Sequence, residues 1–240
     1  MNLRALQAQV AAETRMTLER GETLLVTLGI PVLLLVFFTL VPVLPTGTRH
    51  RVDFLAPGIL ALAVMSTAMV SLGIATAFER SYGVLKRLGA TPLGRPALLT
   101  AKIGSVIMVE LIQVVVLVGA SLTLGWRPHP AAGLAGLAVL LATIAFAGIG
   151  LAMAGALRAE ATLAVANGVY VILLLIGGVI FPLHELGGLS SFARLLPTAA
   201  LSDALHHTLG SGPSTAEAWI VLAVWAVAAP VVAALTFKWD

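Results

Sequence analysis

One acidic side chain lies deep inside a long apolar stretch of the sequence. Glu110 falls within the run from Ile103 to Leu124, and Gln113 follows it about one helical turn later. An ionisable group inside a bilayer is costly and usually faces protein or water. Two roles fit the pair: contact with a substrate or a proton, or a hydrogen bond between helices. The sequence leaves both open.

Other groups of chemically reactive residues are weaker signals. His206 and His207 are adjacent, so on a helix they point about 100° apart and make a poor ligand pair, even with His184. The run GATPLGRP has the glycine spacing of a phosphate-binding loop but lacks its Lys and Ser/Thr. No HExxH motif, no GxSG-like serine with a partnered histidine and no paired intramembrane carboxylates are present. We expect no catalytic site, no metal site and no cofactor bound by this chain.

The most informative segment is the charged stretch over residues 79–102. It contains a short amphipathic helix whose apolar stripe is formed by Tyr82, Leu85 and Leu88, with basic side chains off the stripe. Gly89 is typical of a helix end, and the following Thr-Pro pair is typical of a helix start. The stripe needs a cover, which is either lipid headgroups or a groove on a soluble subunit.

The elements that position these residues follow from composition. Of the 240 residues, 59% are hydrophobic and only 10% are charged, whereas a soluble domain carries about 25% charged residues. We therefore predict an all-α, polytopic membrane protein with a single transmembrane domain. Apolar runs of about 20 residues mark six transmembrane helices. They cover 24–44, 54–78, 103–124, 133–157, 163–183 and 216–237, with Asp53 capping the second helix and Pro57 in its first turn.

The segments between the spans are also interpretable. Residues 1–23 mix Arg and Glu, which favours an amphipathic interfacial helix, or a solvated one, over a signal peptide. Residues 184–215 hold two short helical blocks separated by Pro197, which predicts a re-entrant helical hairpin on the outer side, with an ordinary loop as the alternative. The small residues of 147–156, with Ala164 and Gly168, predict close helix packing.

The basic residues give an orientation. Ten of the 14 Lys and Arg fall in the N-terminus, in residues 79–102, in the turn at 158–160 and in the C-terminus. Because short cytoplasmic loops are rich in Lys and Arg, we predict a multi-pass protein of the plasma membrane with both termini cytoplasmic. A basic balance also suits nucleic-acid binding, but these residues lie between apolar spans, so we expect none. With no cysteine, the chain has no disulfide framework.

Several of these runs together carry a family resemblance. DFLAPGILALAVMSTAMV, FERSYGVLKRLGATPLGRPALLTAK, VILLLIGGVIFPLHEL and FARLLPTAAL follow one another between about residues 53 and 210. They resemble the ABC-2 type transporter permease family, and especially its daunorubicin-resistance-like drug exporters. The pattern ER-x-x-G-x-L-K-x-L-x-x-T-P-L is the specific part. The short first external loop departs from members with large external domains, which disfavours polysaccharide or protein-interacting roles.

The resemblance implies an ATP-driven exporter of amphipathic small molecules such as drugs or lipids. In such proteins the permease pairs with a second permease copy and with ATP-binding cassette subunits, which hold ATP and magnesium. The resemblance implies that residues 79–95 form the coupling helix, and that the segment after the fifth span dips back from outside. The coupling residues are then Glu79, Arg80, Tyr82, Leu85, Arg87, Leu88, Thr91, Pro92 and Arg95. Glu110 and Gln113 belong to a substrate path or to the polar interior.

A second function competes with this one. An ion- or proton-coupled secondary transporter would use Glu110, although the absence of an internal repeat argues against the inverted-repeat type. A neighbouring gene that encodes a protein with a phosphate-binding loop would favour the exporter. The identity of the substrate, and the choice between two identical and two related permeases, are left open by the sequence.

Overall fold

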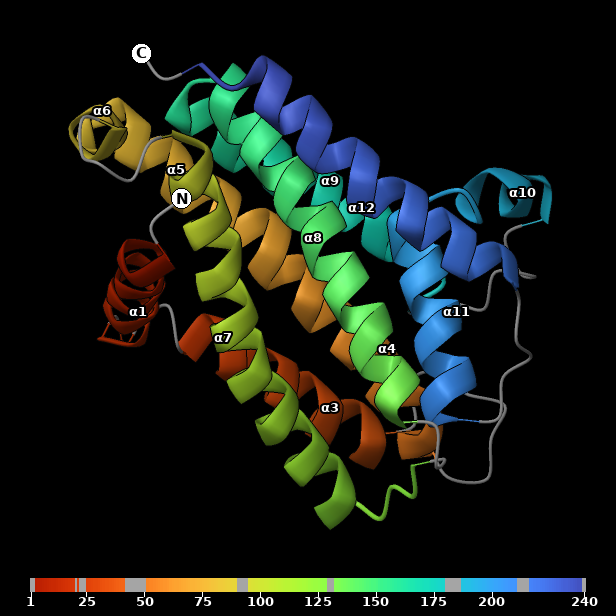
Figure 1. The fold of residues 1–240 in the computed structure, drawn as a ribbon. Coiled ribbons are helices and arrows are strands. Elements are labelled where there is room, and N and C mark those ends of the chain that lie inside the picture. Colours follow the sequence, from red (N-terminus) through yellow and green to blue (C-terminus); the bar gives the residue numbers. More distant parts are fainter. Residues whose placement is uncertain are drawn as a thin grey trace.

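The computed structural model describes residues 3–19, 21, 25–41, 51–89, 95–128, 132–179, 187–210 and 216–238. Within these residues the regular elements are all helical, and the long helices form a bundle (Figure 1). Five of the helices in the described part of the chain are long and apolar enough to cross a membrane. They are Arg51–Ser81, Ala97–Thr123, Gly133–Ala156, Ala159–Ile176 and Ala216–Thr236.

A shorter apolar helix corresponds to the first predicted span. It runs over Leu25–Leu40 and consists of a π-helical part, η1 (Leu25–Gly29), and an α-helical part, α3 (Ile30–Leu40). At about 1.5 Å per residue it is shorter than the roughly 30 Å of a bilayer core. Residue 24 and residues 42–44 of the predicted span lie outside the described residues, so a sixth span stays a prediction.

The second span is one continuous helical rod with a π-helical segment inside it. It comprises α4 (Arg51–Met65), η2 (Ser66–Ser71) and α5 (Leu72–Ser81). The predicted helix start was wrong, because α4 already includes Arg51, which puts Asp53 in the first turn and Pro57 inside the helix. At this position proline removes the backbone hydrogen bond that residue 57 would otherwise donate to the Asp53 carbonyl.

The remaining long helices lie close to the predicted spans, with two corrections. α7 (Arg95–Thr123) begins eight residues before the predicted start at 103, so Lys102 belongs to a helix and not to a loop. α9 (Ala159–Ile176) ends before the predicted 183 because Gly177 and Gly178 follow, the latter at a φ of +70° that favours glycine. α8 (Ala132–Ala156) and α12 (Ala216–Thr236) agree with their predictions.

Close helix packing at the small residues of α8 is confirmed. A Cβ on Gly148 would lie 2.5 Å from the Pro230 nitrogen of α12, and one on Gly150 would lie 2.6 Å from the Met69 carbonyl oxygen of η2. Glycine therefore lets α8 approach two helices backbone to backbone. Ala164 and Gly168 differ, because both are exposed on α9 and a Cβ on Gly168 meets no atom within 4 Å.

Four shorter α-helices and a 3₁₀ turn at residues 187–189 complete the described chain. α1 (Leu3–Glu19) lies beside α7, and α6 (Val84–Gly89) follows α5 at one end of the bundle (Figure 1). α10 (Ser190–Ala193) and α11 (Pro197–Leu209) are the two blocks that Pro197 was predicted to separate. α11 is almost wholly buried against α4, α8 and α12. Protein thus covers its backbone, as a re-entrant helix requires, although re-entry itself stays a prediction.

Candidate functional site

The segment expected to couple to a partner is a helix, a sharp turn and a second short helix. α5 ends at Ser81, Tyr82 and Gly83 form the turn, and α6 begins at Val84. Gly83 has a φ of +70°, a conformation that glycine adopts without strain, and its N–H donates to the Arg80 carbonyl over 2.9 Å. The turn directs α6 away from the axis of α5 (Figure 1).

The apolar stripe of this segment is divided between solvent and core. Tyr82 is 69% exposed, whereas Leu85 is fully buried in the protein's own core and Leu88 is half-buried against it. Lys86 and Arg87 are exposed. Periodicity placed the three apolar residues on one face but could not show that the chain itself covers Leu85.

The other predicted coupling residues fall into two groups. Thr91 and Pro92 lie outside the described residues, and of Arg95 only the backbone, at the start of α7, is described. Glu79 and Arg80 lie in the last turn of α5 and point into the bundle through specific bonds. They hold the segment in place.

Arg80 fixes the end of α5 to the ends of two other helices. Its guanidinium donates to the carbonyls of Gly155 and Leu157, the latter over 2.6 Å, and lies 3.5 Å from the carbonyl of Lys238. The last carbonyls of a helix have no partner within it and carry negative partial charge. A cation at this point satisfies the end of α8 and ties α5 to the C-terminal end of α12.

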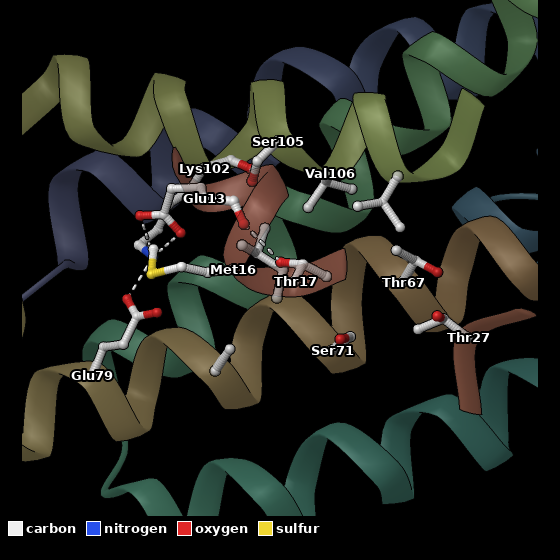
Figure 2. A pocket seen from close by; sticks show the side chains of 13 residues that line it. Glu13, Met16, Thr17, Thr27, Thr67, Ser71, Glu79, Lys102, Ser105 and Val106 are labelled. Atoms are coloured by element: carbon white, nitrogen blue, oxygen red, sulfur yellow. Dashed lines mark hydrogen bonds and ion pairs between the residues drawn. The ribbon is translucent and has the colours of Figure 1, made fainter. Parts of the chain in front are cut away.

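Glu79 belongs to a buried cluster of three charges. The Lys102 ammonium on α7 donates to Glu79 Oε2 over 2.5 Å and to both carboxylate oxygens of Glu13 on α1 over 3.2 Å (Figure 2). Lys102 is only 1% exposed, and it is the largest fully buried side chain among the described residues. The Gln9 amide also donates to Glu13 over 3.0 Å. Three helices therefore meet at one ammonium group.

A small polar cavity adjoins this cluster. Its volume is about 60 Å³, and five hydroxyl-bearing side chains stand around it (Figure 2). They are Thr17, Thr27, Thr67, Ser71 and Ser105. A polar space of this size holds a few water molecules.

Glu110 and Gln113 lie in the protein interior, 2% and 1% exposed. The Gln113 amide donates to the Thr27 carbonyl over 2.5 Å and accepts from the Thr67 hydroxyl over 3.2 Å, so one side chain bridges η1 and η2. Glu110 accepts from the Thr143 hydroxyl of α8, and its other oxygen, Oε1, has no partner within the part of the chain that the structure describes. Bonds between helices account for most of this polar interior.

Comparison with known proteins identifies the family of this helical bundle. A model of the ABC-2 type transporter family matches residues 4–209, which is most of the chain. The chain belongs to the ABC-2 type transporter membrane family. It is a multi-pass membrane protein and the permease component of such a transporter. No curated protein matches it.

Family membership explains which chemistry the permease does and does not supply. An ABC-2 permease domain carries no catalytic site of its own, and it works with ATP-binding subunits. Within the described residues no group of three His, Asp or Glu could hold a metal ion. The His206 ring nitrogens lie 2.7 and 3.1 Å from the carbonyls of Ser202 and Phe54, which joins α11 to α4. His184 lies outside the described residues.

Sequence reasoning missed Lys102, Glu13 and Thr143 in the permease. Lys102 was assigned to a loop, and its partners lie 23 and 89 residues away. The available signal was the apolar spacing of Ala97, Leu98 and Ala101, which shows that the helix starts before Lys102.

Proposed function

We propose that this permease is the membrane subunit of an ATP-driven exporter of amphipathic small molecules, such as drugs or lipids. The resemblance over residues 53–210 to daunorubicin-resistance-like exporters supports this substrate class. In this proposal two permeases, identical or related, pair with separate ATP-binding subunits that hold ATP and magnesium. Efflux of toxic compounds, and hence antibiotic resistance, is the corresponding physiological role.

The exposed surface at the α5–α6 turn carries this proposal. Tyr82, Lys86 and Arg87 present an aromatic ring and two cations to solvent at the end of a rod that Arg80 anchors. Exposed aromatic and Arg side chains on a rigid element are typical anchors at protein interfaces. We assign docking of the ATP-binding subunit to Tyr82, Arg87 and Leu88, continued by Thr91, Pro92 and Arg95. In this assignment Glu79, Arg80 and Leu85 support the docking surface from inside.

The docking surface is tested by capture of the ATP-binding subunit with which the permease works. Tyr82→Asp should lower capture from detergent extracts at least tenfold and abolish ATP-dependent export, because it places a carboxylate where an apolar ring docks. Tyr82→Phe, which keeps the ring, is the matched control and should behave as wild type. Equal capture by Tyr82→Asp and wild type would exclude this surface as the coupling element. Leu85→Asp is unsuitable as a test, since Leu85 is buried in the permease itself.

The proposal fixes an orientation. Six spans place both termini and residues 79–102 in the cytoplasm, with α10 and α11 on the outer side. The chain has no cysteine, so single cysteines report accessibility directly. A membrane-impermeant maleimide added to intact cells should label Ser191→Cys and should not label Ser81→Cys. The opposite labelling pattern would reverse the orientation.

An apolar hollow supports the substrate class. Residues from the end of η1 through α3 to Val41, with Val116 of α7, line an open space of about 720 Å³. Its lining is Leu28, Gly29, Val32, Leu33, Val36, Phe37, Leu40, Val41 and Val116. Ligand sites commonly fall in the range of about 300–1,000 Å³ and are mostly apolar. If the hollow holds the apolar part of the substrate, Val36→Trp should raise the KM for Hoechst 33342 export severalfold in everted vesicles without changing the permease level.

A proton-coupled carrier is the alternative, favoured by one observation. Glu110 is buried and has an oxygen without a partner in the described chain, as expected of a group that exchanges a ligand or proton. The carrier would move substrate in proteoliposomes with a proton gradient and no ATP-binding subunit, and Glu110→Gln would abolish that movement. The exporter should be inactive in the same vesicles until the ATP-binding subunit and ATP are added.

A further inference from the structure

The Lys102 cluster joins three elements that have different expected movements. Lys102 is in α7, Glu13 in the N-terminal helix α1, and Glu79 in the last turn of α5, next to the docking surface. Two carboxylates face one ammonium, so the cluster carries one negative charge in excess. One acid is enough to pair with the buried ammonium of Lys102, so the presence of a second acid suggests a further role.

The two arms of the cluster are built differently. The Glu13 arm uses both carboxylate oxygens, is supported by Gln9, and lies where Val10 of α1 packs against Gly104 of α7. The Glu13 side chain is 10% exposed. The Glu79 arm uses one oxygen, and its side chain is 23% exposed. The first arm is buried in a helix contact, whereas the second can reach water.

This difference allows the bond between Glu79 and Lys102 to break without leaving the buried ammonium unpaired. A buried lysine that loses its only partner is strongly destabilising, but Lys102 would remain paired with Glu13. The polar cavity is lined by all three charged residues, Glu13, Glu79 and Lys102, and its hydroxyl groups can accommodate water or a moved carboxylate (Figure 2).

We propose that Lys102 is a positioning residue with a permanent partner, Glu13, and a releasable partner, Glu79, through which movement of the docking surface is passed to α7 and α1. The proposal rests on the proposed function, since the movement is driven by the ATP-binding subunit. When α5 moves with the docked subunit, the Glu79 bond breaks and forms again. The Glu13 bond keeps α1 and α7 together throughout.

The first experiment measures coupling with Glu79→Gln in proteoliposomes that contain the permease, its ATP-binding subunit and Hoechst 33342. The ratio of dye transported to ATP hydrolysed should fall at least fivefold, while the melting temperature stays within a few degrees of wild type. Loss of folded protein alone would lower both rates and leave the ratio unchanged. Glu19→Gln, an exposed acid of α1 that pairs only with Arg15 in the described chain, is the matched control and should leave the ratio unaltered. A wild-type ratio in Glu79→Gln would overturn the proposal.

A second experiment separates the two arms. The Cβ atoms of Val10 and a residue substituted at Gly104 lie about 4.0 Å apart, which suits a disulfide. Val10→Cys with Gly104→Cys should therefore cross-link on oxidation and keep the wild-type ratio. Glu13→Gln weakens the bond between α1 and α7, which the cross-link replaces, so the cross-link should restore the ratio of transport to hydrolysis in this variant. In Glu79→Gln the cross-link should leave the ratio low. Two results would show that the arms do not have these roles. One is a restored ratio in cross-linked Glu79→Gln, and the other is a loss of transport when the double-cysteine variant with both glutamates intact is cross-linked.

Measurements on wild-type permease separate failure of the proposed function from failure of the coupling role of Lys102. If wild type shows no ATP-dependent transport with its ATP-binding subunit, the proposed function fails, and the coupling role of Lys102 fails with it. If wild type transports the dye and Glu79→Gln does so with the same ratio, only the inference about Lys102 fails.

Discussion

The contact between α8 and α12 and the contact among α1, α5 and α7 are made in opposite ways. At the first, glycine and alanine let the two backbones touch, and Gly148 leaves no space for even one added carbon. At the second, a lysine and two glutamates meet beside a cavity of about 60 Å³. A backbone contact has one fitted arrangement, whereas charges with two partners and adjoining polar space have more than one. We therefore expect the first region to be rigid and the second to move.

The largest effect is expected where there is no space. Gly148→Val would force its side chain into the backbone of Ala229 and Pro230, and should cost more than about 4 kcal/mol, enough to prevent accumulation of folded permease. Gly168→Val is the matched control, because a Cβ added at Gly168 would meet no atom of another described segment within 4 Å. The check is the amount of monodisperse protein after detergent extraction. Equal yields of the two variants would contradict the rigid contact.

Removal of the shared cation should have the next largest effect. Lys102→Met leaves two carboxylates facing each other in a buried site, and should lower stability by about 3–5 kcal/mol. Lys86→Met, at an exposed position of α6, should leave stability unchanged. Thermal unfolding followed by tryptophan fluorescence measures both. A small loss in Lys102→Met would mean that the acids find other partners.

The Arg80 anchor lies between the two regions and should have an intermediate effect. Arg80→Met removes charge-assisted bonds to the carbonyls at the end of α8, and should cost about 2 kcal/mol. Protease nicking within residues 81–95 should also become faster, since α5 is no longer fixed to α8 and α12. Arg87→Met, which is exposed, serves as the control for both measurements. An unchanged nicking rate would show that α6 alone holds the segment.

The smallest effect is expected for Gln113. Bonds between helices in membranes average about 0.6 kcal/mol, so the loss of two in Gln113→Leu should cost about 1 kcal/mol. Gln7→Leu, on the exposed side of α1, should cost nothing measurable. Chemical unfolding in mixed micelles resolves a difference of this size. A loss several times larger would make Gln113 a principal determinant of stability.

Sequence alone was sufficient for the features that depend on local composition. Hydropathy located the long helices because a run of about 20 apolar residues is a strong signal, and Pro197 marked the start of α11 because proline fits a first helical turn. The interior cluster was inaccessible to the same reasoning. Glu13 and Lys102 are 89 residues apart, and nothing in either neighbourhood identifies the other. Leu85 shows the same limit, since a stripe on a short helix does not reveal what covers it.

The two π-helical segments have a consequence for how the first two apolar helices face their neighbours. A π-helical turn contains about one residue more than an α-helical turn, so its loss would rotate everything beyond it by roughly 100° about the helix axis. In η1 the Thr27 carbonyl, and in η2 the Thr67 hydroxyl, are both held by Gln113. One amide on α7 therefore sets the rotational register of two separate helices together. Any rearrangement that turned α3 about its axis, and with it the apolar hollow, would first have to release that amide.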